Sequence, residues 1–264
     1  MPQSPAGPAV CHPGDLWQLG PHLIYCGSAI DEPSYKLLLG EDRAATVFTE
    51  PLRDAGQVYR IPPLRSARWS FLTQICALLS LYSHPGSLHY LCTAWPDADQ
   101  LSNAALQARL KQVGLCVWAR DKPGSGSLYE NQHEFVLVFE QCRLHEPDPD
   151  LRNKRGRPRS DLWRYAEPRS SRGTRDGLKP VQLVADAILD STASGEIVLD
   201  TFLGQGTTLM AAEQTKRVCR GVEFDPRAVD LAIRRWQTFT GKPAYHSATR
   251  RSFDDISSTL GDQP

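Results

Sequence analysis

The sequence has 264 residues, of which 41% are hydrophobic and 23% charged, a balance that is ordinary for a globular protein with a buried core. Its 30 Lys and Arg residues equal its 30 Asp and Glu residues, so attraction to a polyanion has to come from where the charges lie and not from their sum. There is no run of about 18 apolar residues, which excludes a membrane-spanning helix.

The N-terminal stretch MPQSPAGPAVCHPG has neither the basic start nor the apolar core of a signal peptide. We therefore expect residues 1–13 to be a disordered tail. The seven cysteines are scattered and form no Cys-x-x-Cys pair, so we expect neither a redox motif nor a metal site. Free cysteines within apolar runs are typical of a protein of the reducing cytoplasm.

Short apolar runs alternate along the chain with amphipathic segments. The runs predict a hairpin over 15–29 and further strands at 44–48, 87–95, 114–120, 133–140, 196–202 and 218–224. Apolar residues at helical spacing, with turn signals, predict helices at 31–39, 69–83, 98–112, 179–192, 206–215 and 226–241. Strands that alternate with helices indicate an α/β protein with a mainly parallel sheet.

Residues 141–178 have almost no apolar periodicity and are predicted to form a loop rich in Pro, Arg and Ser. Between Arg152 and Arg175 this loop carries nine basic residues against Asp161 and Glu167. A stripe of this kind fits a polyanionic partner. The structural alternative is a solvated flexible loop.

Two short pairs have a structural and a functional interpretation, and a third has a structural one. His133-Glu134 before a strand is interpreted as a pair satisfied by its neighbours, with a general base or a ligand as the alternative. Trp163 and Tyr165 are interpreted as packing anchors, with base stacking as the alternative. Asp225-Pro226 is typical of a helix start, with the aspartate as the N-terminal cap.

The strongest chemical signal is IVLDTFLGQGTT at residues 197–208. A buried strand ends at Asp200, crosses a turn with Gly204 and Gly206, and enters a helix. Glycines allow close approach of a ligand to the backbone, and a helix N-terminus presents amide donors. The next strand ends at Glu223, where a carboxylate can accept hydrogen bonds from a ribose diol. In open α/β sheets, ligands bind at these carboxyl ends.

Other interpretations of this turn stay open. A tight strand-to-helix turn without a ligand is the structural one. A dinucleotide site needs a third glycine, and Leu209 stands at that position, which argues against a nicotinamide enzyme.

The longer string VLDTFLGQGTTLMAAEQTKRVCRGVEFDP resembles the S-adenosylmethionine site of DNA amino-methyltransferases, which methylate adenine N6 or cytosine N4. That family has Asp-Pro-Phe-x-Gly-x-Gly-Thr-Thr at the strand end, and here Thr201 replaces the proline. The resemblance implies that S-adenosylmethionine is the cofactor. The implied cofactor-binding residues are Asp200, Phe202, Gly204, Gly206, Thr207, Thr208, Glu223 and Lys179.

Other segments are similar to the family subgroup whose catalytic motif precedes the cofactor motif. The similarity implies a single methyltransferase domain over 14–242, followed by a polar tail at 243–264. It also implies a Rossmann-like methyltransferase fold, with a mainly parallel seven-stranded sheet and helices on both faces. The loop at 141–178 is implied to contact double-stranded DNA, mainly through phosphates. The implied DNA-binding residues are Arg152, Lys154, Arg155, Arg157 and Arg159.

In this family Val-Phe-Thr leads into the catalytic loop Asp-Pro-Pro-Tyr, and the same strand here leads into Glu50, Pro51, Leu52 and Arg53. A carboxylate and a backbone carbonyl accept the two N–H bonds of the target amine, and the aromatic ring stacks on a flipped base. Glu50 keeps the charge but adds a methylene. Arg53 can still lie flat on a base.

The resemblance implies a site-specific DNA methyltransferase of a restriction–modification type, with adenine N6 preferred over cytosine N4. The alternative is a methyltransferase fold that binds cofactor or DNA without turnover, because the catalytic loop reads Glu-Pro-Leu-Arg. A second departure supports this alternative, since the histidine usual before the family's Lys-Pro is absent before Lys179-Pro180.

Overall fold

The computed structural model describes residues 8–51, 64–124, 128–142, 159–168 and 178–261. Its strands are β1 (Leu16–Leu19), β2 (His22–Cys26), β3 (Ala44–Thr49), β4 (Ser83–Thr93), β5 (Leu110–Ala119), β6 (His133–Gln141), β7 (Leu162–Arg164), β8 (Ile197–Asp200), β9 (Val218–Glu223) and β10 (Tyr245–His246). Its helices are α1 (Glu32–Leu39), α3 (Arg65–Leu81), the short 3₁₀ helix η1 (Trp95–Asp97), α4 (Ala98–Gln107), α6 (Val181–Ser191), α7 (Thr207–Thr215), α8 (Pro226–Thr240) and α9 (Phe253–Gly261).

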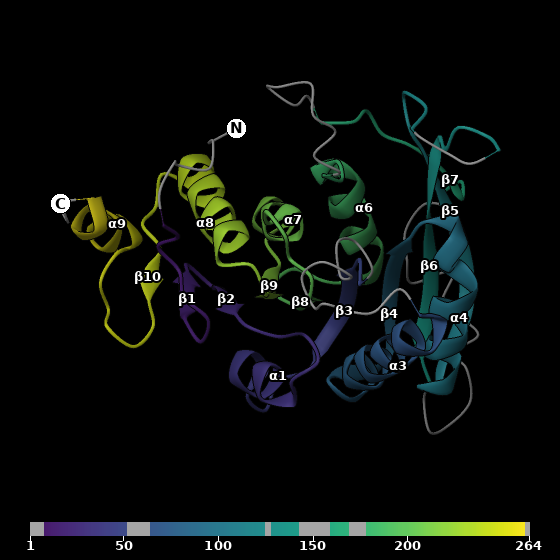
Figure 1. Cartoon of the computed structure of the whole chain (residues 1–264), viewed down its shortest axis with the longest axis horizontal. Helices are drawn as coiled ribbons and strands as arrows, with labels where there is room; N and C mark the ends of the chain where they lie inside the picture. Colours follow the sequence, from purple (N-terminus) through teal and green to yellow (C-terminus); the bar gives the residue numbers. More distant parts are fainter. Residues whose placement is uncertain (1–7, 52–63, 125–127, 143–158, 169–177, 262–264) are drawn as a thin grey trace.

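The strands of the described residues form one sheet in the order β10-β1-β2-β9-β8-β3-β4-β6-β5-β7. The central strands β2, β9, β8, β3 and β4 are mutually parallel. The pairs β10–β1, β1–β2, β4–β6 and β6–β5 are antiparallel. Figure 1 shows α1, α3 and α4 on one face of the sheet and α6, α7 and α8 on the other. The predicted α/β class with helices on both faces is therefore confirmed.

The strand number differs from the prediction, and antiparallel pairs flank the parallel centre of the sheet. The described chain has a mixed sheet of ten strands, where seven mainly parallel strands were expected. The turn at Gly20-Pro21 joins β1 directly to β2, and their antiparallel pairing confirms the predicted hairpin. The short strands β7 and β10 extend the two edges, in segments where the sequence shows no apolar alternation.

The apolar side chains form a core on each face of the sheet. Beneath one face, Tyr35, Leu72 and Leu101 pack with strand residues such as Val47. Above the other face, α6, α7 and α8 contribute the buried side chains Ile188, Leu209 and Trp236, among others. The rigid double-sided layer fixes the ends of the parallel strands relative to one another.

One predicted helix is shorter than expected, and one predicted loop contains a strand. The helix expected over 98–112 stops at Gln107, because Arg109 has a φ of 62° and begins a turn into β5. Within the loop predicted at 141–178, Leu162–Arg164 forms β7, which pairs with β5. Trp163 is buried there, with 8% of its surface exposed, and this confirms the packing interpretation.

Residues 8–13 and 243–261, which were expected to belong to tails, pack against the rest of the domain. The backbone N–H groups of Val10 and Cys11 donate to the Asp230 carboxylate at 2.8 and 2.9 Å. Near the other end, β10 pairs with β1, and the buried Phe253 contacts Trp17 edge to face. Buried anchors of this kind hold both segments on the domain. No helix in the described residues is long and apolar enough to cross a membrane.

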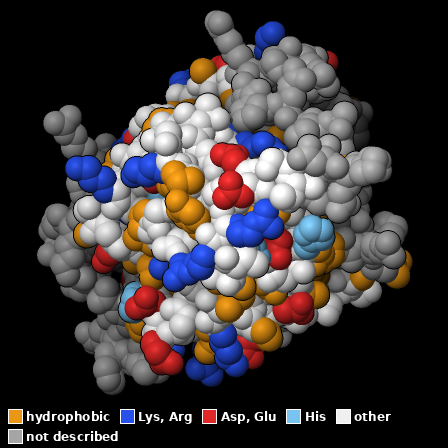
Figure 2. Space-filling view, turned by 90° about the vertical axis from the view of Figure 1, so that its left-hand side faces the viewer, with side chains coloured by type: hydrophobic (Ala, Val, Ile, Leu, Met, Phe, Trp, Pro, Cys, Tyr) orange, Lys and Arg blue, Asp and Glu red, His pale blue; other side chains and the backbone are white. Residues whose placement is uncertain are grey.

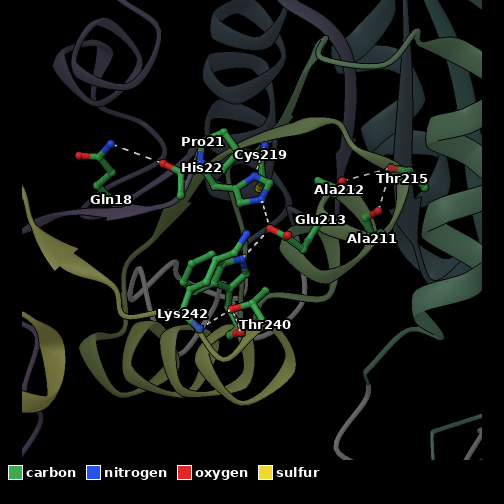
Figure 3. Close-up of polar contacts among 12 residues, drawn as sticks. Gln18, Pro21, His22, Ala211, Ala212, Glu213, Thr215, Cys219, Thr240 and Lys242 are labelled. Atoms are coloured by element: carbon green, nitrogen blue, oxygen red, sulfur yellow. Dashed lines mark hydrogen bonds and ion pairs between the residues drawn. The ribbon is translucent and has the colours of Figure 1, made fainter.

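A buried histidine ties four elements together at the amino ends of the parallel strands (Figure 3). The Cys219 N–H donates to His22 Nδ1 at 2.9 Å, so the proton of the neutral ring lies on Nε2, which donates to Glu213 at 2.8 Å. The Trp236 indole donates to the same Glu213 oxygen at 2.9 Å. Burial lowers the pKa of His22. This network joins β2, β9, α7 and α8 at the amino ends of the parallel strands, whereas Glu50 and Glu223 lie at the carboxyl ends.

Candidate active site

Three adjacent parallel strands end at the same edge of the sheet. The order β9-β8-β3 places Glu223, Asp200 and Glu50 at or directly after neighbouring carboxyl ends. Val47 lies opposite Leu199, and Asp200 lies opposite Gly221. The topology therefore brings together the carboxylates that the sequence motifs singled out, at the edge where α/β sheets bind ligands.

Asp200 organises the turn that follows β8. Its Oδ1 accepts from Thr49 Oγ1 at 2.8 Å and from the Phe202 N–H at 3.1 Å. Its Oδ2 accepts from Thr208 Oγ1 at 2.6 Å. Burial raises the pKa of Asp200 to about 6, although these three hydrogen bonds oppose the rise. Asp200 thus links the ends of β3 and β8 to the start of α7.

Glu223 closes the turn from the side of β9. Its two oxygens accept from the N–H groups of Gly204 at 2.7 Å and of Asp225 at 2.8 Å. Burial raises the pKa of Glu223, and the two backbone hydrogen bonds oppose the rise. The Asp225 side chain in turn accepts from the Arg227 N–H at 3.0 Å, which confirms it as the cap of α8.

The two glycines of the turn serve different purposes. Both have left-handed backbones, with φ of 52° at Gly204 and 79° at Gly206. A Cβ on Gly206 would lie 2.9 Å from the Cβ of Ala232, whereas a Cβ on Gly204 would meet nothing within 4 Å. Gly206 is thus required for packing against α8, while Gly204 faces open space that a ligand can enter.

The remaining predicted cofactor residues lie around this turn. Thr207 and Thr208 are buried at the start of α7. The Phe202 ring lies edge to face with Phe71 of α3, with the ring centroids 6.0 Å apart. These contacts connect the turn to helices on both faces of the sheet.

Lys179 lies in a position that the motifs did not indicate. Its ammonium is 2.5 Å from Glu50 Oε2 and 3.0 Å from Glu134 Oε2. The Lys179 side chain is 6% exposed, so both ion pairs lie in a largely dehydrated place. The structure thus joins Lys179, predicted to bind cofactor, to the predicted catalytic carboxylate. A direct contact with a cofactor stays a prediction.

Glu134 is the member of this cluster that the sequence analysis did not place in the site. The His133-Glu134 pair at the start of a strand was the available signal, and of its two members Glu134 is satisfied by neighbouring charges, as the structural interpretation expects. Glu134 also lies 3.8 Å from Arg120, whose Nε donates to Glu167 at 2.8 Å. A chain of alternating charges therefore runs from the end of β3 to the segment after β7.

Of the predicted catalytic loop, the structure describes Glu50 and the buried Pro51. Leu52 and Arg53 lie outside the described residues, as do Arg152, Lys154, Arg155 and Arg157 of the predicted DNA contacts. Their roles stay predictions.

Arg159 is the predicted DNA contact that the structure describes. Its guanidinium lies 2.5 Å from Asp186 and 3.1 Å from Asp190, both on α6. Tyr165 OH donates to Asp186 at 2.6 Å. These contacts give Arg159 an anchoring role for the segment. Within the described ranges, no group of three or more His, Cys, Asp or Glu side chains could hold a metal ion.

Known proteins that are similar to this chain include DNA methyltransferases. Residues 109–234 match the N6_N4_Mtase family, described as DNA methylase. The type II methyltransferase M.Cfr9I of Citrobacter freundii is 35% identical over 115 residues, which cover 40% of this chain and 36% of the relative. The matched stretch thus spans about a third of that relative's length, and a quarter to two fifths of the next two curated relatives.

Solved structures share the fold. The protein TTHA0409 from Thermus thermophilus superposes with a TM-score of 0.62 at 19% identity, over 82% of this chain and 95% of that one. The same protein has also been solved in complex with S-adenosyl-L-methionine. The PvuII DNA methyltransferase, which is cytosine-N4-specific, superposes with a TM-score of 0.61 at 14% identity, over 90% of both chains.

Proposed function

We propose that this chain, which is related to the DNA amino-methyltransferase family, transfers a methyl group from S-adenosylmethionine to an exocyclic amine of DNA. The observation that carries the proposal is the meeting of Glu50-Pro51, the glycine turn after β8 and Glu223 at three adjacent strand ends. A carboxylate and a backbone carbonyl beside a turn that is open to a ligand supply the acceptors that methylation of an amine needs.

The residues around the turn fit the proposed cofactor. The open space over Gly204 admits the methionine part close to the backbone. Glu223 is placed for the ribose hydroxyls, since a carboxylate oxygen accepts more than one hydrogen bond. When bound, S-adenosylmethionine supplies an electrophilic methyl group on a sulfonium. Asp200 stabilises the conformation of the turn by accepting hydrogen bonds from the hydroxyls of Thr49 and Thr208.

Glu50 and Pro51 act on the amine. A conjugated exocyclic amine is a poor nucleophile because its lone pair is delocalised into the base. The Glu50 carboxylate and the Pro51 carbonyl accept its two N–H bonds and so localise the lone pair toward the methyl group. As the new N–C bond forms, the bond between the methyl carbon and the sulfonium sulfur would break with its electron pair left on sulfur, and one proton leaves the nitrogen to Glu50 or to water. Lys179 fixes the carboxylate by its ion pair at 2.5 Å.

The finer assignments belong to the same proposal. We assign adenine N6 in double-stranded DNA as the target, on the resemblance of the motifs, and a role in restriction–modification. The name of the relative M.Cfr9I supports the latter. A structural neighbour that acts on cytosine N4 makes the methylated base a result that the experiment has to identify.

The test is transfer of labelled methyl from S-adenosylmethionine to unmethylated genomic DNA, followed by mass spectrometry of the nucleosides. We expect N6-methyladenine. Glu50→Gln should reduce the rate by about 10²-fold, because the neutral amide is a weaker acceptor for the N–H of the target amine, with cofactor affinity retained. Glu41→Gln, at an exposed glutamate, is the matched control and should change nothing.

A second candidate function has an observation in its favour. Glu50 is one methylene longer than the aspartate of the resembled motif and is bound to Lys179, so the carboxylate can be displaced from the amine. The protein would then bind cofactor or DNA without turnover. Cofactor binding by calorimetry without any methylated nucleoside would decide for this candidate and against the first.

A further inference from the structure

A hollow of about 360 Å³ lies between the first two turns of α3 and of α4, and none of its lining residues belongs to the turn after β8. Arg65, Ser66, Trp69, Gln100 and Asn103 line it. Its volume is in the range of ligand pockets, roughly 300–1,000 Å³. Its lining combines an indole ring, two amides, a hydroxyl and a guanidinium.

The topology places this hollow at the same edge of the sheet as Glu50. Strand β4 runs parallel to β3, with Leu91 opposite Thr49, and α4 starts within a few residues of the end of β4. The ion pair of Arg68 with Asp97, at 2.7 Å, joins the start of α3 to the start of α4. The hollow and Glu50 therefore lie on the side of the sheet where β3 and β4 end.

Gln100 shows that the hollow is suited to a hydrogen-bonding ligand. The residue is only 8% exposed, and its side-chain oxygen is buried without a hydrogen-bond partner within the part of the chain that the structure describes. Buried acceptors are paired in nearly all proteins, because an unpaired one is costly. Because this oxygen is covered, a ligand N–H group reaches it when the Gln100 side chain turns into the hollow that the residue lines, with the Asn103 amide as a neighbouring partner.

The other side chains define the shape and charge of that ligand. Trp69 is 37% exposed, and an exposed indole offers a flat apolar face for stacking. The two arginines at the start of α3 are paired, Arg65 with Asp99 and Arg68 with Asp97. With these charges balanced, the hollow suits a planar, uncharged ring with hydrogen-bonding edges better than a phosphate.

We propose that this hollow binds a nucleobase of the DNA substrate other than the one that is methylated. The base stacks on Trp69 and hydrogen-bonds to Gln100, as amide side chains do with base edges. This assignment rests on the proposed function, since it takes DNA as the ligand. It gives the enzyme a contact that reads or holds a flanking base.

The experiment measures binding of fluorescently labelled mixed-sequence DNA, single-stranded and duplex, by anisotropy. Trp69→Leu and Gln100→Leu should each weaken binding, the former at least about fivefold. The dependence on salt should stay unchanged, because no phosphate contact is lost. Phe239→Leu, at a half-exposed ring on α8, is the matched control. The melting temperatures of all variants establish that they fold.

The outcomes separate the two proposals. If the wild type binds no DNA, the proposed function is wrong and this assignment falls with it. If the wild type binds DNA and both variants bind equally well, only the assignment of the hollow is wrong. A third arm titrates free adenosine and cytidine. Nucleoside binding that Trp69→Leu abolishes, with DNA affinity unchanged, would also overturn the assignment, because the ligand would then be a free nucleoside.

Discussion

The Glu50 side chain has one methylene more than the aspartate of the resembled motif, and it forms an ion pair with Lys179. The side chain reaches the Lys179 ammonium at 2.5 Å, and Glu134 holds the same ammonium from the other side at 3.0 Å. Three charges in so buried a place are stable only as a set, because each loses its hydration on folding. Lys179 therefore acts as a positioning residue for Glu50 in the proposed reaction.

Lys179→Met should lower the free energy of unfolding by about 3 kcal/mol, since it leaves two buried carboxylates side by side. In the proposed reaction it should also lower kcat by about 10²-fold, because Glu50 loses its fixed position. Lys179→Arg should recover part of both. Denaturant unfolding and methyl transfer measure the two effects. Full activity of Lys179→Met would show that the ion pair does not position Glu50.

Asp200 should make the protein less stable as the pH rises. Its pKa is raised from 3.8 to about 6 in the folded state, so between these values the folded protein binds more protons than the unfolded chain. The stabilisation from the protonated group is complete below about pH 4 and is lost as the pH rises through about 6. The whole change is on the order of 3 kcal/mol.

Denaturant unfolding of the wild type and of Asp200→Asn, measured from about pH 4 to pH 7, tests the direction of this pH dependence. The difference between their free energies of unfolding should change up to about pH 6 and stay constant above it. The variant has to be compared with the wild type because His22 acts in the opposite direction. Burial lowers the pKa of His22, so its protonation makes the folded protein less stable on acidification. A constant difference over the whole range would mean that Asp200 titrates normally.

At the level of elements, the turn from β8 into α7 combines a ligand cradle with a packing constraint. Gly206 is the N-cap of α7 in a left-handed conformation and faces α8, while Gly204 faces open space. The two glycines share a left-handed backbone, which an added side chain would strain, and differ in crowding, so they form a matched pair of sites for substitution.

Gly206→Ala should destabilise the protein by clearly more than Gly204→Ala. The latter carries only the cost of the left-handed backbone, about 1–2 kcal/mol, whereas the former also forces Ala232 away from its place 2.9 Å from the new Cβ. Denaturant unfolding of both variants gives the comparison. Equal losses would show that α7 and α8 adjust freely, and that the packing role of Gly206 is wrong.

For the whole molecule, the zero formal charge is spread unevenly. On the face that carries α9 and β10, Lys and Arg side chains are interspersed with Asp and Glu side chains (Figure 2). The basic stripe of the sequence falls between Arg152 and Arg175 instead. Attraction to DNA is thus expected to depend on that one segment.

Replacing Arg152, Lys154, Arg155 and Arg157 together by alanine should make the salt dependence of DNA binding less steep. The slope of log K against log salt should fall by roughly 0.9 for each phosphate contact that is lost. Arg159→Ala should reduce the slope less and lower the melting temperature, since Arg159 is paired with Asp186 and Asp190. An unchanged slope in the fourfold variant would contradict the predicted DNA contacts.

The α/β class, most helices and strands, and the turn with Asp200, Gly204 and Gly206 could be predicted from the sequence, because each follows from patterns within a few consecutive residues. The sequence also indicated that Glu50 and Glu223 end strands. The folded chain was needed to show that these ends are neighbours, that Lys179 lies between Glu50 and Glu134, and that β7 and β10 extend the sheet. These features join residues far apart in the chain, and their energies come from strand order, burial and paired charges, which local periodicity does not encode.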